Sequence, residues 1–107
     1  MAQAKIIVMY PQPTDTASFD RAYDSEHIPM ALKNFKGLTR FVTTKVVGAV
    51  QGKASFYRMA ELYFPSMEAL QAAAGSELGK QAVAHGMGIS TGGPMVILVA
   101  EEQSFTP

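Results

Sequence analysis

The first quarter of the chain carries a strand signal and then a helix signal, and this order decides the fold. Residues 5–30 read KIIVMYPQPTDTASFDRAYDSEHIPM. The run Lys5–Tyr10 is rich in β-branched residues and predicts a strand, which Pro11 stops. Asp15 or the next residue can then cap a helix. We therefore expect a strand, a short loop and an amphipathic helix.

The predicted helix carries an aromatic and imidazole series. Phe19, Tyr23 and His27 recur every four residues, which places them about one turn apart on neighbouring parts of one face. Pro29 limits this helix, so we expect a kink or a second short piece that ends near residues 35–37. His27 would then lie at a helix C-terminal end. There the macrodipole favours an imidazolium and burial favours a neutral ring.

The middle of the chain reads as a hairpin. Leu38–Val50 is rich in threonine and valine and predicts the second strand. Residues 51–53 provide a turn, and Ser55–Phe64 predicts the third strand. These two strands should pair antiparallel.

The last third predicts helices and a final strand. An alanine-rich helical region follows in two parts, Met67–Ala74 and Glu77–His85. Gly86–Gly93 is interpreted as a flexible loop. Met95–Ala100 is a continuous apolar run, which is typical of a strand that is buried on both faces.

The element order βαββαβ predicts a ferredoxin-like α+β fold, with a four-stranded antiparallel sheet and both helical segments on one face. One helical layer covers only one face of the sheet, and alternate residues of a strand point to opposite faces. Apolar residues nevertheless occur at both alternating sets of positions, for example Ile6 and Val8 in one set and Ile7 and Met9 in the other. Self-association is the economical way to bury the second face. We expect a single domain over residues 1–107 that pairs sheet against sheet as a homodimer.

Composition argues against several classes of function. The formal net charge is zero and there is no run of like charges, so neither nucleic acid nor an anionic membrane surface is an expected partner. The chain has no cysteine, which excludes disulfides, thiolate zinc sites and a cysteine nucleophile. No signal-peptide pattern and no apolar run of about 18 residues is present, so we expect a cytoplasmic protein.

Three segments in this order resemble the EthD family, which is named for ether degradation: Val8-Met9-Tyr10-Pro11, then Phe19-x-x-x-Tyr23-x-x-x-His27-x-Pro29-Met30, then Lys36-Gly37-Leu38. The likeness covers essentially the whole chain. It implies a dimeric α/β barrel and a role in the oxidative breakdown of ethers and other organic compounds. Similar barrels include cofactor-free monooxygenases, cyclases, isomerases and haem-binding enzymes. The chain departs from many relatives in having Ala22-Tyr23 and Glu26-His27, where those carry paired Tyr-Tyr or His-His.

His27 is the first candidate for catalysis, as general base, general acid or hydrogen-bond donor, because imidazole titrates near neutral pH. The alternative is a structural role as a cap of the preceding helix carbonyls. Tyr23 is the second catalytic candidate, because its hydroxyl could orient a substrate or the imidazole. A tyrosine at this spacing from Phe19 is equally typical of a core residue.

Four further residues are candidates for binding an apolar ligand: Tyr10, Phe19, Met30 and Arg58. Arg58 alternates with apolar residues, so it needs a carboxylate partner or an anionic ligand. It differs in parity from Glu61, so only one of the two can face a given pocket.

Other features have simpler explanations. His85 precedes a glycine and is interpreted as a helix C-terminal cap. The glycine-rich stretch after it does not match a phosphate-binding pattern. The spacing of the two histidines favours no metal site, and a lone histidine before proline is not a haem motif, so we expect no cofactor.

These observations favour a small-molecule enzyme or binding protein, and the resemblance to the EthD family implies a catabolic oxidoreductase similar to cofactor-free monooxygenases, or an accessory protein of such a pathway. His27 would ionise a phenol-like or enolisable substrate. A lyase, cyclase or isomerase would use the same proton transfer without oxygen. The remaining alternative is a non-catalytic carrier of an apolar metabolite. An enzyme requires a second polar group to converge with His27 on the ligand.

Overall fold

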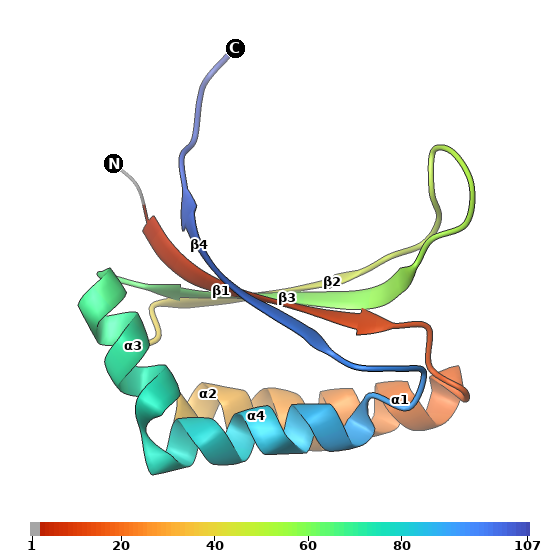
Figure 1. Cartoon of the computed structure of the whole chain (residues 1–107), viewed down its shortest axis with the longest axis horizontal. Helices are drawn as coiled ribbons and strands as arrows, with labels where there is room; N and C mark the ends of the chain where they lie inside the picture. The colour runs from red at the N-terminus through yellow and green to blue at the C-terminus, as the bar shows by residue number, and fades with distance from the viewer. Residues whose placement is uncertain (1–2) are drawn as a thin grey trace.

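The computed structural model describes residues 3–107 and contains one antiparallel sheet with helices on one face (Figure 1). The strand order is β2-β3-β1-β4, which confirms the ferredoxin-like α+β prediction. The elements are β1 (Gln3–Pro11), α1 (Thr16–Ala22), the π-helical turn η1 (Tyr23–His27), α2 (Ile28–Asn34), β2 (Arg40–Lys45), β3 (Phe56–Phe64), α3 (Met67–Gly75), α4 (Glu77–Ile89) and β4 (Val96–Glu102).

Short polar side chains fix where the helices begin. The Asp15 carboxylate accepts hydrogen bonds from the backbone N–H groups of Ala17 and Ser18. The Ser66 hydroxyl accepts from the next helix in the same way, and Ser76 begins α4. Each cap satisfies a backbone donor that has no partner within its own helix. The predicted starts of these helices are confirmed.

Elements α1, η1 and α2 form one helical segment that lies over the sheet (Figure 1). Its buried residues include Phe19, Tyr23, His27 and Ala31, which are spaced four apart. In an ideal α-helix such a series would rotate by about 120° and turn away from the sheet. In η1 the backbone N–H of Ile28 donates to the carbonyl of Tyr23, so the turn holds one extra residue. This reverses about 100° of the rotation and keeps the series buried.

The helix does not end at His27, which corrects the sequence-based expectation. Pro29 lies in the first turn of α2, and the chain remains helical to Asn34. Proline has no N–H to donate to the carbonyl four residues earlier, and its ring would crowd that carbonyl in a regular α-helix. The wider turn η1 accommodates both effects, so Pro29 changes the hydrogen-bonding pattern and leaves the helix intact.

Three other boundaries differ from the predictions. Strand β2 ends at Lys45, where its residue-by-residue pairing with β3 also ends; the Val46 N–H still donates to the Tyr57 carbonyl at 2.8 Å, but residues 46–50 belong to the loop. Helix α4 continues to Ile89, so the start of the glycine-rich stretch is helical. Strand β4 is an edge strand, and Val99 is 60% exposed, so the prediction of burial on both faces was wrong.

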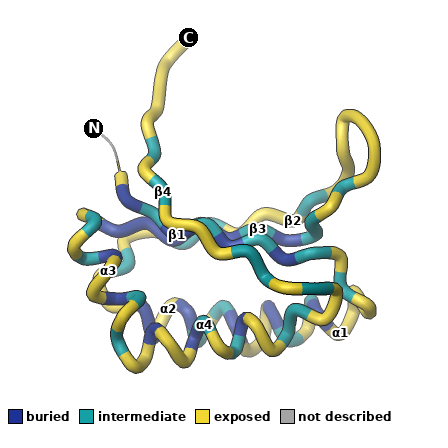
Figure 2. Tube along the Cα trace, in the orientation of Figure 1, coloured by how far each residue is buried: buried dark blue, intermediate teal, exposed yellow. Residues whose placement is uncertain are grey.

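The two faces of the sheet are unequal. Ile6, Val8 and Tyr10 are buried beneath the helices, and the residues between them point the other way. No helix covers that second face in the described part of the chain, and the β2–β3 loop and the C-terminal segment rise on that side (Figures 1 and 2). We call it the open face. By strand register it includes Ile7, Met9, Val42, Met59 and Leu98.

The open face also carries a polar cluster around Lys5. The Lys5 ammonium lies 2.7 Å from the Glu102 carboxylate and also forms an ion pair with Glu61. Tyr63 donates a hydrogen bond of 2.6 Å to Glu102. The hydrogen bonds to the two carboxylates raise the pKa of Lys5. The open face is therefore apolar with one compact charged group.

Two glycines of α4 provide a test of the packing at the α3–α4 junction. A Cβ at Gly79 would lie 2.0 Å from the carbonyl oxygen of Ala73, whereas a Cβ at Gly88 would meet nothing within 4 Å. We expect Gly79→Ala to lower the free energy of unfolding by about 1–3 kcal/mol. Gly88→Ala should be neutral or stabilise the helix by up to about 1 kcal/mol. Urea denaturation measures both, and equal effects would contradict the packing.

Candidate functional site

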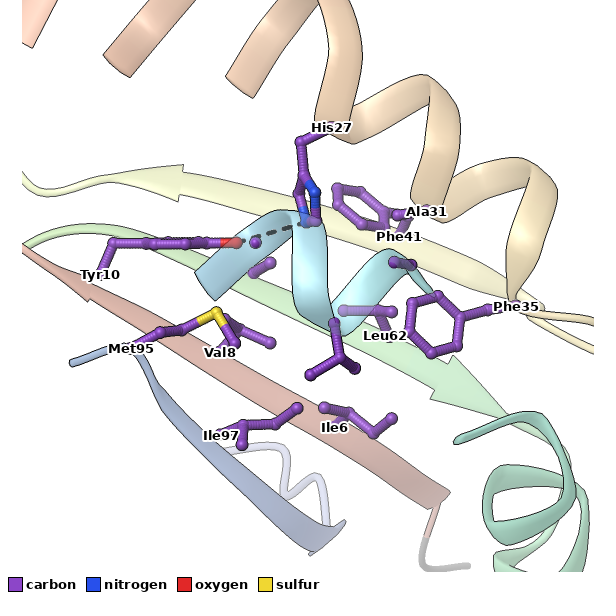
Figure 3. A pocket seen from close by; sticks show the side chains of 14 residues that line it. Ile6, Val8, Tyr10, His27, Ala31, Phe35, Phe41, Leu62, Met95 and Ile97 are labelled. Carbon is purple, nitrogen blue, oxygen red and sulfur yellow. Dashed lines mark hydrogen bonds between the residues drawn. The ribbon is translucent and has the colours of Figure 1, made fainter. Parts of the chain in front are cut away.

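A small cavity lies between the helical layer and the sheet (Figure 3). It measures about 20 Å³, which is room for about one water molecule. Its walls are mainly apolar side chains from both layers, among them Val8, Ala31, Phe41, Leu62 and Met95. Tyr10 and His27 also line it and bring the polar atoms.

Tyr10 and His27 meet at the cavity wall. The Tyr10 hydroxyl oxygen lies 3.3 Å from Nε2 of His27, as the dashed line in Figure 3 marks. Strand β1 supplies the phenol and η1 supplies the imidazole. The two residues are 1% and 8% exposed, so their ionised forms are poorly solvated. The site therefore couples two neutral polar groups inside an apolar wall.

Burial controls the protonation of both groups. Burial, with a smaller contribution from the neighbouring His85 ring, lowers the pKa of His27 to about 4. Burial also raises the pKa of Tyr10, with a smaller contribution from Tyr23. The sequence left open whether the helix dipole or burial governs His27. The helix continues past this residue and burial prevails, so His27 is neutral and Tyr10 is protonated at neutral pH.

The two histidines of the chain are in contact. Nδ1 of His27 lies 3.0 Å from Nδ1 of His85, and the rings stack with centroids 5.2 Å apart. Nε2 of His85 lies 3.3 Å from a carboxylate oxygen of Glu26. His85 lies inside α4, so its interpretation as a helix cap was wrong. The sequence analysis missed this contact, because no local pattern links two residues that are 58 positions apart.

Gly86 allows α4 to approach the cavity. A Cβ at this position would lie 2.9 Å from the Tyr10 hydroxyl oxygen and 3.2 Å from Cε1 of His27. A side chain here would fill the space beside both polar groups. The sequence analysis placed Gly86 in a loop because glycine is a weak helix former. Its spacing of four from the small, buried Ala82 was the signal for a continuing helix.

Three predicted site residues lie away from the cavity wall. The Tyr23 hydroxyl forms a hydrogen bond of 3.0 Å with Thr43, and its ring stacks on Phe19. Phe19 is part of the buried core, and Met30 packs against that core. None of the three lines the cavity. Tyr23 nevertheless packs beside His27, with ring centroids 5.7 Å apart.

Arg58 forms an internal ion pair on the helical side of the sheet. Its guanidinium lies 3.2 Å from Asp20 and 3.6 Å from Asp24, and it stacks over the Tyr23 ring at 4.5 Å. A register irregularity between β1 and β3 places Tyr57 beside it, and the Tyr57 hydroxyl donates to the same Asp20 carboxylate at 2.8 Å. Arg58 therefore has carboxylate partners, and it does not line the cavity.

Within residues 3–107, no group of three or more His, Cys, Asp or Glu side chains is arranged to hold a metal ion. No helix in the same range is long and apolar enough to span a membrane.

Comparison with known proteins identifies relatives over almost the whole length. A protein of Rhodococcus erythropolis, described as an uncharacterized 11.0 kDa protein in the thcB-thcC intergenic region, is 33% identical over 104 residues, which cover 96% of this chain and 98% of that one. The crystal structure of an ethyl tert-butyl ether degradation (EthD) family protein from Bacillus halodurans C-125 is 32% identical. It superposes with a TM-score of 0.86 over 94% of this chain and 99% of that one.

A more distant structure shares the fold alone. A dimeric ferredoxin-like protein of unknown function from Jannaschia sp. CCS1 is 16% identical, with a TM-score of 0.63 over 97% of this chain and 100% of that one. The EthD domain profile matches residues 11–88, which is most of the chain and includes η1 and all but the last residue of α4. The chain belongs to the EthD family.

Proposed function

We propose that the chain is a small-molecule enzyme in which His27 exchanges a proton with an organic substrate bound beside Tyr10. The convergence of the Tyr10 hydroxyl and Nε2 of His27 on one apolar cavity is the observation that carries this proposal. Membership of the EthD family supports a role in the oxidative breakdown of ethers or other organic compounds. The reaction class would be that of a cofactor-free oxygenase.

The two polar groups have complementary roles in this proposal. Neutral His27 accepts a proton from a phenol-like or enolisable substrate. Protonated Tyr10 donates a hydrogen bond to the substrate oxygen on which negative charge develops, and this interaction is strong because the walls are apolar. The resulting anion is the species that reacts with oxygen. A lyase, cyclase or isomerase would begin with the same proton transfer.

Substrate entry requires the cavity to widen, because about 20 Å³ holds no organic molecule. The wall formed by Met95 and Ile97 is the part best suited to move. Ile97 is 39% exposed and lies on the edge strand, and Met95 is only partly buried. Methionine has three rotatable bonds and adapts to irregular shapes.

A non-catalytic carrier of an apolar molecule is the second candidate. A carrier needs apolar surface and gains nothing from a proton acceptor paired with a proton donor. The burial of a proton acceptor beside a proton donor at the cavity wall favours an enzyme, because an apolar ligand would form no hydrogen bond with either group.

We also propose that the chain forms a homodimer through the open face. Ile7, Met9 and Leu98 lie there without cover from any described element, and Leu98 is 46% exposed. Burial of such apolar area favours association by roughly 25 cal/mol per Å². The distant structural neighbour from Jannaschia is itself described as dimeric.

Val46 and Val47, which the sequence analysis placed in a strand, lie in the β2–β3 loop.

Leu98→Glu tests the dimer. The wild-type chain should scatter light as a particle of about twice 11.5 kDa, and Leu98→Glu should scatter as a monomer because a charge in the interface would be buried without a partner. Leu32→Glu is the matched control, since Leu32 is 55% exposed on α2 and away from the open face. A monomeric wild-type protein at micromolar concentration, or a dimeric Leu98→Glu, would contradict the proposal.

Two probes of nearly equal shape test the proton acceptor. 4-Nitrophenol has a proton to give and 4-nitroanisole, its methyl ether, has none. Equilibrium dialysis should give roughly 3- to 10-fold tighter binding of the phenol, the worth of one hydrogen bond. His27→Phe, whose side chain has no acceptor, should remove this preference. Tyr10→Phe should weaken binding of both probes, and Tyr23→Phe should change neither. If the wild type binds the two probes equally, as His27→Phe should, the protein is a carrier.

The neutral state of His27 is testable without a ligand. Its pKa is about 4 in the folded chain against 6.5 in the unfolded chain, so between these values the unfolded state binds more protons. Stability should fall as the pH falls from 6.5 to 4. His27→Gln lacks this contribution, so the wild type should lose stability relative to the variant over this window and keep a constant difference above it. Urea midpoints that run parallel would contradict a buried neutral imidazole.

A further inference from the structure

A continuous series of polar side chains leads from the cavity to solvent. The Tyr10 hydroxyl is 3.3 Å from Nε2 of His27, Nδ1 of His27 is 3.0 Å from Nδ1 of His85, and Nε2 of His85 is 3.3 Å from Glu26. Exposure rises along the series. His27 is 8% exposed, and the side chains of His85 and Glu26 are 22% and 66% exposed. The far end is therefore in contact with water.

The contact between the two Nδ1 atoms requires one ring to donate and the other to accept. Glu26 as a carboxylate can only accept, so Nε2 of His85 carries a hydrogen. Neutral His85 then has no hydrogen on Nδ1 and must accept the one on Nδ1 of His27. That leaves Nε2 of His27 without a hydrogen, where it accepts from Tyr10. The outer pair thereby selects the His27 tautomer that presents a proton acceptor to the cavity.

We propose that His85, held by Glu26, is a positioning and relay residue: it keeps the Nε2 lone pair of His27 facing the cavity and takes over the proton that His27 removes from a ligand. This inference rests on the proposed function of His27. Its geometric basis is the contact between the Nδ1 atoms of His27 and His85 together with the carboxylate on the far side of His85.

The transfer balances as two coupled proton shifts. The ligand O–H or C–H bond breaks and an N–H bond forms at Nε2 of His27. The N–H bond at Nδ1 of His27 breaks and one forms at Nδ1 of His85. The ligand becomes an anion, His27 stays neutral with its hydrogen on the other nitrogen, and His85 becomes an imidazolium that donates to both His27 and Glu26.

The relay places the positive charge where it is better stabilised. On His27 the charge would be buried among apolar walls, which is costly. On His85 it lies beside a carboxylate and in partial contact with water. Glu26 and His27, both from η1, are the titratable groups within hydrogen-bonding distance of His85. A buried base with little affinity for a proton can thus still remove one from a ligand.

The positioning role is tested on the ligand-free protein by ¹⁵N NMR of the ring nitrogens. In the wild type near neutral pH, His27 should carry its hydrogen on Nδ1. In His85→Phe the acceptor is lost, and the hydrogen should move to Nε2, from which it donates to Tyr10. His85→Gln keeps a side-chain carbonyl and should retain the wild-type tautomer, which also controls for any loss of folding in His85→Phe. A hydrogen on Nε2 in the wild type, or the same tautomer in His85→Phe, would overturn the positioning role.

The relay role is tested with bound 4-nitrophenol, whose phenolate absorbs visible light. At a pH where the free probe is mostly neutral, the wild type should convert bound probe to phenolate. His85→Gln should still bind the probe more tightly than 4-nitroanisole, but its ratio of bound phenolate to bound neutral phenol should be roughly tenfold lower, the effect of one pKa unit on the probe. Equal phenolate in both proteins would overturn the relay. Loss of the binding preference in the wild type would instead count against the proposed function of His27.

Discussion

The constraint on which the rest of the structure depends is the match between one helical segment and the sheet beneath it. Four buried residues at four-residue intervals would drift by about 120° around a regular α-helix, and η1 supplies the extra residue that keeps them on the face toward the sheet. This turn places His27 over β1 and within reach of Tyr10. The position of the candidate base is thus a consequence of how the helix satisfies its packing.

Packing also determines the chemistry. The apolar walls that hold the two layers together remove water from Tyr10 and His27, so both are neutral at physiological pH. The approach of α4 at Gly86 brings His85 against His27 while it leaves space beside the phenol. The same contacts that stabilise the fold therefore give the His27 imidazole a nitrogen that faces the cavity as a hydrogen-bond acceptor. They also place the ring of His85 on the other side of His27.

Sequence reasoning was reliable where the determinants are local. Strand periodicity correctly separated Arg58 from Glu61, and the serine and aspartate caps marked the helix starts. It was wrong at the end of α4, because it gave more weight to the low helix propensity of Gly86 than to its spacing of four from Ala82. The four-residue spacing placed Tyr23 beside His27, but its hydroxyl direction depends on Thr43 in a distant strand. The contact between two histidines 58 positions apart likewise depends on how α4 crosses η1.

Strand β1 serves two purposes through alternate residues. Ile6, Val8 and Tyr10 border the cavity, while Lys5, Ile7 and Met9 belong to the open face. A substitution at one parity leaves the other surface almost untouched, because the sheet separates them. Divergence among descendants of such a chain can therefore alter ligand preference and subunit pairing independently, which suits a small scaffold to repeated recruitment for new substrates.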